Sequence, residues 1–155
     1  MVEIMVVLVI IGLLAVLAIP AFKHMKETAM EKRFISDLRT FAQAFEAYAS
    51  KNGRWPTESA AGVVPTGMAG EFREDTWGSR NSLGGLWYWD YKAVTGYTAG
   101  ISTVEVTVDD ASMTNIDAMI DDGDLTKGSF VKISGGGGGI PGSGGTSRYL
   151  FVLQK

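Results

Sequence analysis

An uncharged stretch of nineteen residues, 4–22, follows a single carboxylate, Glu3, at the start of this chain. In an α-helix, which rises about 1.5 Å per residue, such a stretch spans roughly 30 Å. That length matches the hydrocarbon thickness of a bilayer, and a long run without charges is typical of a membrane helix. We therefore expect residues 1–22 to form an apolar helix that lies in a membrane or among copies of itself.

Two residues within this stretch, Gly12 and Pro20, weaken the helix that contains them. Glycine lowers helix preference, and proline lacks the N–H group that would bond the preceding turn. A plain anchor needs neither residue, nor an acid at its apolar end, where an ionised group is costly unless it has a partner. A secretory signal would begin with basic residues and have a shorter apolar core. The pattern indicates a role beyond anchoring.

Residues 1–22 resemble the start of a type IV pilin or a type II secretion pseudopilin. The segments that match are Met1-Val2-Glu3-Ile4-Met5-Val6-Val7, Ile10-Ile11-Gly12-Leu13-Leu14-Ala15 and Ala18-Ile19-Pro20-Ala21-Phe22. Farther along, Asn52-Gly53-Arg54-Trp55-Pro56 is similar to the end of the long helix in this family. In the family, two residues and a short basic leader precede the position of Met1. We expect either that two mature residues are missing here or that the mature terminus is unusual.

The resemblance implies a role for Glu3 in assembly. In this family the carboxylate pairs with the free α-amino group of a neighbouring subunit, and a carboxylate in an apolar medium does need a cation or a proton. The alternative is that Glu3 lies at the bilayer interface without a specific role. The resemblance also implies that the helix melts locally between Gly12 and Pro20 when the filament assembles.

Apolar residues recur at helical spacing beyond this segment, which predicts that the helix continues and packs on a core. They stand four, three, four and three residues apart at Phe34, Leu38, Phe41, Phe45 and Tyr48. Lys51, Asn52 and Gly53 then provide a helix stop. We therefore expect a long N-terminal helix over residues 1–53 and a globular, β-rich head over residues 54–155.

The head shows the alternation of apolar and polar residues that is typical of strands. Strands are expected at residues 86–94, 101–108, 131–134 and 148–153, a helical turn at 69–73, and a short helix at 114–122 capped by Ser112 or Thr114. The glycine-rich segment 135–145 is expected to link the last two strands. The predicted fold class is α+β and pilin-like: a long helix, apolar in its first half and amphipathic in its second, packed on a small antiparallel sheet.

Aromatic residues at alternate positions of the first expected strand, Trp87, Trp89 and Tyr91, share one face. They either pack against the long helix or form a platform on which bases or sugars stack. Packing against the helix is the favoured interpretation. The mildly acidic charge of the chain, −3, also argues against a nucleic-acid partner.

Four carboxylates surround Gly123, namely Asp117, Asp121, Asp122 and Asp124. Major pseudopilins carry a calcium site in an Asp- and Gly-rich loop near the C-terminus, and Ca²⁺ binds six to eight oxygens. Asp121, Asp122 and Asp124 are therefore candidate Ca²⁺ ligands, although their spacing fits neither that loop nor an EF-hand. A solvated acidic turn is the alternative. Because the chain has no cysteine, a bound ion would be one way to hold its C-terminal region.

No catalytic motif is present, and the single histidine, His24, follows the apolar segment. We therefore expect a structural subunit rather than an enzyme, one that polymerises into an extracellular or periplasmic type IV pilus-like filament. The resemblance implies that the subunit lies in the inner membrane before assembly, and that its partners are other copies, a prepilin peptidase and the filament-assembly machinery. The alternatives are a membrane-tethered binding module and a pseudopilin of a secretion system.

Overall fold

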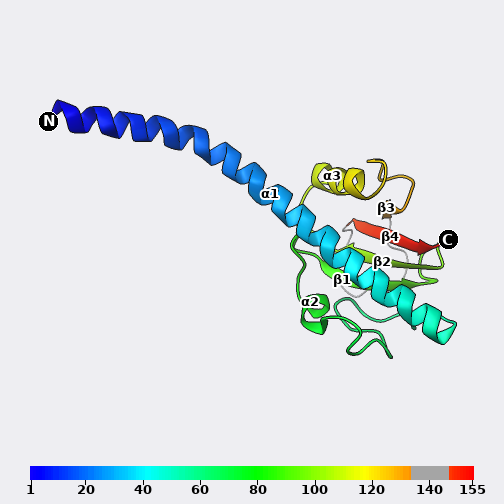
Figure 1. The fold of residues 1–155 in the computed structure, drawn as a ribbon. Coiled ribbons are helices and arrows are strands. Elements are labelled where there is room, and N and C mark those ends of the chain that lie inside the picture. The colour runs from blue at the N-terminus through cyan, green and yellow to red at the C-terminus, as the bar shows by residue number, and fades with distance from the viewer. Residues whose placement is uncertain (134–146) are drawn as a thin grey trace.

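The computed structural model describes residues 1–133 and 147–155, apart from the side chains of residues 17, 18, 20 and 21. Its elements in chain order are α1 (Val2–Asn52), α2 (Glu74–Gly78), β1 (Leu86–Tyr91), β2 (Ala99–Val104), α3 (Asp110–Ile120), β3 (Phe130–Ile133) and β4 (Arg148–Gln154). Figure 1 shows α1 as one curved helix whose first half projects away from the head and whose second half lies across the sheet. The predicted α+β, pilin-like fold is confirmed.

The sheet is antiparallel throughout, with the strand order β1-β2-β4-β3. The C-terminal strand therefore lies inside the sheet, where Ile101 of β2 and Phe130 of β3 both pair with Phe151 of β4. Gly100 allows β2 and β4 to approach, because a Cβ atom at this position would lie 2.6 Å from the Leu150 side chain. The expected glycine-rich connection at residues 135–145 lies outside the described residues.

The second half of α1 covers one face of this sheet. Its predicted apolar stripe is buried from Phe34 to Phe45 and partly buried at Tyr48. The Phe45 ring stacks on Trp89 with 4.0 Å between ring centroids. Phe34 stacks on Trp87 in the same way at 4.8 Å. Both tryptophans are 0% exposed, so they belong to the core and are closed to bases or sugars. Gly53 then ends α1 with a φ of 66°, which confirms the predicted helix stop.

Two helix predictions in the head need correction. The short helix begins at Asp110, because the carboxylate of Asp109 caps it by accepting a hydrogen bond from the Ser112 N–H at 3.0 Å. Ser112 and Thr114 are therefore inside the helix and do not cap it. The expected turn at residues 69–73 is present only at residues 69–71, where the Glu71 N–H donates to the Met68 carbonyl at 3.1 Å. The helix α2 follows it, and its buried Trp77 donates the indole N–H to the Val63 carbonyl.

The second strand is shorter than expected at its C-terminal end. β2 stops at Val104, because the next residue, Glu105, has a φ of 57° and leaves the extended conformation. Val106 and Val108 lie beyond the strand but still pack against the core. The alternation of apolar residues therefore continued past the point where the backbone leaves the sheet.

A buried polar cluster ties the C-terminal strand to the other face of the sheet. Arg148 of β4 forms an ion pair with Asp90 of β1, and both contact Ser102 of β2. All three residues are less than 7% exposed, and burial lowers the pKa of Arg148. Loss of either charged partner would leave the other buried and unpaired, which is strongly destabilising. This cluster holds β4 in a chain without disulfides.

Candidate assembly helix and acidic cluster

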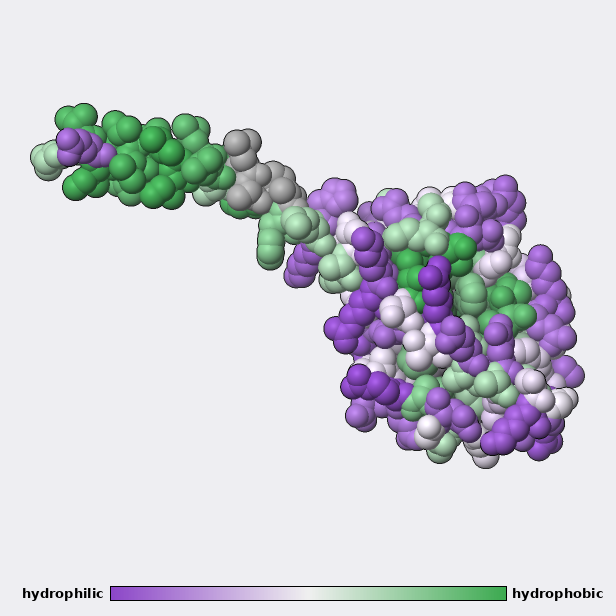
Figure 2. Space-filling view, in the orientation of Figure 1, coloured by the Kyte–Doolittle hydropathy of each residue, from purple (hydrophilic) through white to green (hydrophobic). Residues whose placement is uncertain are grey.

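The N-terminal half of α1 exposes a continuous apolar surface. Every large apolar side chain described between Val2 and Val16 is at least 51% exposed, and Val2 itself is 74% exposed. Figure 2 shows this half as an almost wholly apolar rod, whereas the visible surface of the head is mostly hydrophilic with smaller apolar patches. Soluble monomers rarely expose a contiguous apolar patch of this extent, so the surface indicates an interaction site.

Residues 1–22 are the segment for which the sequence predicts a membrane span. Within the described part of the chain, no helix is both long and apolar enough to cross a membrane. The membrane span over residues 1–22 therefore stays a prediction.

Three residues predicted to act in assembly lie along this rod. Glu3 is exposed in the first turn of α1, and Pro20 is part of the same helix. Gly12 lies in open space, since a Cβ atom there would meet nothing within 4 Å. No close contact within the single chain requires a glycine at this position. The predicted melting between Gly12 and Pro20 concerns the assembled filament and stays a prediction.

The second candidate site is a cluster of three carboxylates where α3 ends. Asp117 is 0% exposed, and neither of its carboxylate oxygens has a hydrogen-bond partner among the described residues. One oxygen each from Asp117, Asp121 and Asp122 lie within 4.8 Å of one another. Burial raises the pKa of Asp117, and the charges of Asp122 and Asp121 raise it further, against a smaller lowering by nearby backbone N–H groups.

Asp124 makes separate contacts and lies outside this cluster. Its carboxylate accepts hydrogen bonds from the backbone and side chain of Thr126, and Lys127 Nζ lies 3.0 Å from its Oδ2 atom. The hydrogen bond from the Thr126 hydroxyl is the main cause that lowers the pKa of Asp124 to about 2. Lys127 also lies 3.6 Å from Asp122 and partly neutralises the turn.

The geometry of the cluster fits a Ca²⁺ ion. Calcium binds oxygens at 2.3–2.6 Å, so two ligands of one ion lie at most about 5 Å apart. The three carboxylates meet this limit and would supply three of the six to eight oxygens. The oxygens of Asp117 have no hydrogen-bond partner among the described residues, and a bound cation would supply one. The structure thus groups Asp117, rather than the predicted Asp124, with Asp121 and Asp122. In the sequence, the spacing of four residues between Asp117 and Asp121 is the signal that could have indicated this grouping, because it places both on one face of a helix.

An exposed apolar helix joined to a small antiparallel head is a pilin-like fold, and comparison with known proteins gives a more particular similarity. Over 55 residues, 36% of this chain, it is 40% identical to type II secretion system core protein G of Aeromonas hydrophila and 44% identical to the protein of the same name from Klebsiella pneumoniae. These matches cover 38% and 39% of the two relatives, so the chain spans less than two-fifths of their length. No known family profile and no solved structure matches the chain. The similarity confirms the predicted resemblance to type IV pilins and type II secretion pseudopilins.

Proposed function

We propose that this chain is a structural subunit that polymerises, through the apolar half of α1, into a helical filament in the periplasm or outside the cell. The names of its relatives favour a filament of a type II secretion system, that is, a pseudopilus. Before assembly the subunit would lie in the inner membrane, where a prepilin peptidase and the assembly machinery would act on it. The role needs no catalytic group.

The contrast between the two halves of α1 carries this proposal. From Phe34 to Phe45 the helix buries its apolar stripe in the head, whereas from Val2 to Val16 the apolar side chains are exposed all round. A helix that is apolar on every side needs an apolar environment on every side. Other copies of the same helix supply this environment in a filament, and the heads then remain outside, in water.

Glu3 is the residue that favours polymerisation over simple membrane anchoring as the role of this helix. It is the only charged residue among the first 22, and an anchor has no need of it. In a filament core its carboxylate would pair with the α-amino group of the next subunit. Breaking a buried ion pair by removing one partner costs about 3–5 kcal/mol, enough to prevent the addition of a subunit.

Electron microscopy of filaments sheared from cells that produce the full chain and its assembly machinery tests the proposal. The wild-type chain should form long thin filaments, and Glu3→Ala should form none while its head remains folded. Glu27→Ala provides a matched control, because Glu27 is an exposed carboxylate on the same helix beyond the apolar half. Normal filaments from Glu3→Ala would refute the assigned role of Glu3. The absence of wild-type filaments would favour the alternative, a membrane-tethered binding module.

A further inference from the structure

The charge of the head is distributed unevenly, with an excess of aspartate at α3 and the turn that follows it. Residues 109–132 contain six aspartates and two lysines, a net charge of −4. Because the whole chain carries −3, the remaining residues together carry +1. In Figure 1 this acidic segment lies on one side of α1, and α2 lies on the other side.

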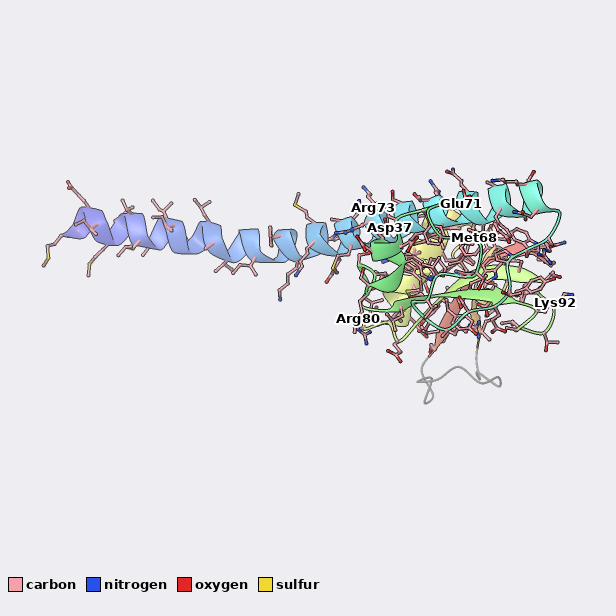
Figure 3. All side chains as sticks on the ribbon, turned by 90° about the horizontal axis from the view of Figure 1, so that it is seen from below. Asp37, Met68, Glu71, Arg73, Arg80 and Lys92 are labelled. Atoms are coloured by element: carbon pink, nitrogen blue, oxygen red, sulfur yellow. The ribbon has the colours of Figure 1, made fainter. Side chains whose placement is uncertain are left out.

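A groove of about 440 Å³ lies on the α2 side, between α1, α2 and the loop at residues 79–82. Arg33, Arg73 and Arg80 line it together with two aspartates, Asp37 and Asp75. Figure 3 shows Asp37, Arg73 and Arg80 at the end of the head from which the N-terminal half of α1 emerges. The groove therefore combines an excess of positive charge with a position next to the proposed filament core.

Arg73 is the guanidinium available to a partner. Arg33 Nε lies 4.0 Å from Asp37, and Arg80 pairs with Glu105 at 3.2 Å. Arg73 is exposed and makes no salt bridge with the residues that the structure describes. A guanidinium can bind a carboxylate through two parallel hydrogen bonds, which fixes orientation as well as charge.

Hydrogen bonds hold the loop of this groove in place. The Ser82 hydroxyl donates to the Met30 carbonyl of α1 at 2.8 Å. The side-chain oxygen of buried Asn81 accepts from the N–H groups of Leu83 and Gly85 at 3.0 and 3.1 Å. A partner that enters the groove therefore does not have to order the loop, and this lowers the entropic cost of binding.

We propose that this groove receives the acidic turn, residues 121–124, of a neighbouring copy of the chain. This contact presupposes the proposed filament. It adds to that proposal a contact that determines how neighbouring heads are positioned. The two complementary surfaces lie on opposite sides of α1, so one copy can use both at once with two different neighbours. Such a head-to-tail contact generates an open helical array when its rotation does not close into a ring, which is the geometry that a filament requires. The apolar rods contribute cohesion, and the charged contact fixes the register between heads.

Charge reversal tests this contact. With calcium removed by a chelator, so that no ion neutralises the turn, Arg73→Glu and Asp122→Lys should each lower filament yield about tenfold, because like charges then face each other at every subunit contact. The double variant, which exchanges the two charges, should restore the yield. Arg54→Glu provides the matched control, since Arg54 is also exposed and lies outside the groove. Melting temperatures of the variants check that each head is folded.

Cross-linking provides the second readout, because the chain has no cysteine of its own. Filaments that carry both Arg73→Cys and Asp122→Cys should give a ladder of covalent oligomers after mild oxidation, and each single variant should give no ladder. Wild-type filament yield from Arg73→Glu, a folded double charge variant that restores nothing, or double-cysteine filaments without a ladder would each overturn the contact and leave the filament proposal intact. Failure of the wild-type chain to form filaments would overturn both.

Discussion

Replacing Asp117 by asparagine should stabilise the folded chain at neutral pH when calcium is absent. The Asp117 carboxylate is fully buried, lacks hydrogen-bond partners among the described residues and has a raised pKa. The folded chain therefore keeps its proton to a higher pH than the unfolded chain does. The stability that this group contributes falls as the pH rises from its ordinary pKa through its folded pKa, and the loss is complete above the folded pKa.

The size of the effect follows from the geometry of the cluster. Two unit charges 4.8 Å apart, the limit within which these oxygens lie, repel each other by roughly 1–3 kcal/mol at an effective dielectric constant between about 80 and 20. The cost of an unsatisfied buried polar group, about 1–3 kcal/mol, remains when asparagine replaces the carboxylate, so it does not contribute to the difference. Asparagine keeps the shape of the side chain and removes its charge. We therefore expect a gain of about 1–3 kcal/mol above the folded pKa and almost none in acid.

Urea denaturation of the full chain in mild detergent with a chelator, followed by tryptophan fluorescence, measures this gain. Asp109→Ala is the control with the opposite pH trend, because hydrogen bonds from the Ser112 backbone and hydroxyl lower the pKa of the Asp109 cap. The stability from Asp109 is present above its ordinary pKa and is lost as the pH falls through its folded pKa. A destabilised Asp117→Asn variant at neutral pH, or a difference that does not depend on pH, would refute the reasoning.

Three further predictions concern the ion, the core and the filament. Calcium should raise the melting temperature of the wild-type chain above its value with a chelator, and Asp122→Ala should abolish the shift; no shift in the wild type would leave these carboxylates as surface charge. Phe45→Ala should lower the free energy of unfolding by about 3–5 kcal/mol in urea denaturation, because Phe45 is 0% exposed and stacks on Trp89. A cost below about 1 kcal/mol would contradict this packing. In a filament map, α1 should be interrupted between Gly12 and Pro20, and an unbroken helix through this segment would exclude the expected melting.

The sequence predicted the long helix and its packing because both depend on local patterns. The apolar run marks the first half of α1, and the spacing from Phe34 to Phe45 marks the face that is buried. The left-handed glycine after Asn52 gives the end of the helix. Each of these signals operates within a few residues along the chain, which is why a single sequence contains enough information.

Strand pairing and the polar clusters could not be predicted in the same way. Alternation identifies strands but not their neighbours, and β4 enters the sheet between β2 and β3 through contacts far apart in sequence. Asp90 and Arg148 lie in separate strands, and nothing in the sequence indicates that the folded sheet brings them into an ion pair. The alternative interpretation, a solvated acidic turn, does not hold for Asp117, which shares the buried face of α3 with Met113 and Ile116. In α3, helical spacing places Asp117 and Asp121 close together but does not show that the core covers Asp117.

A three-dimensional reconstruction of the assembled filament by electron cryomicroscopy tests the central claim most directly. The account predicts that the apolar half of α1, residues 2–16, lies at the filament axis against the same segment of neighbouring copies, with the heads outside. Within that core, Glu3 should lie beside the α-amino group of an adjacent subunit. A filament held together by heads alone, with residues 2–16 exposed at its surface, would contradict the account.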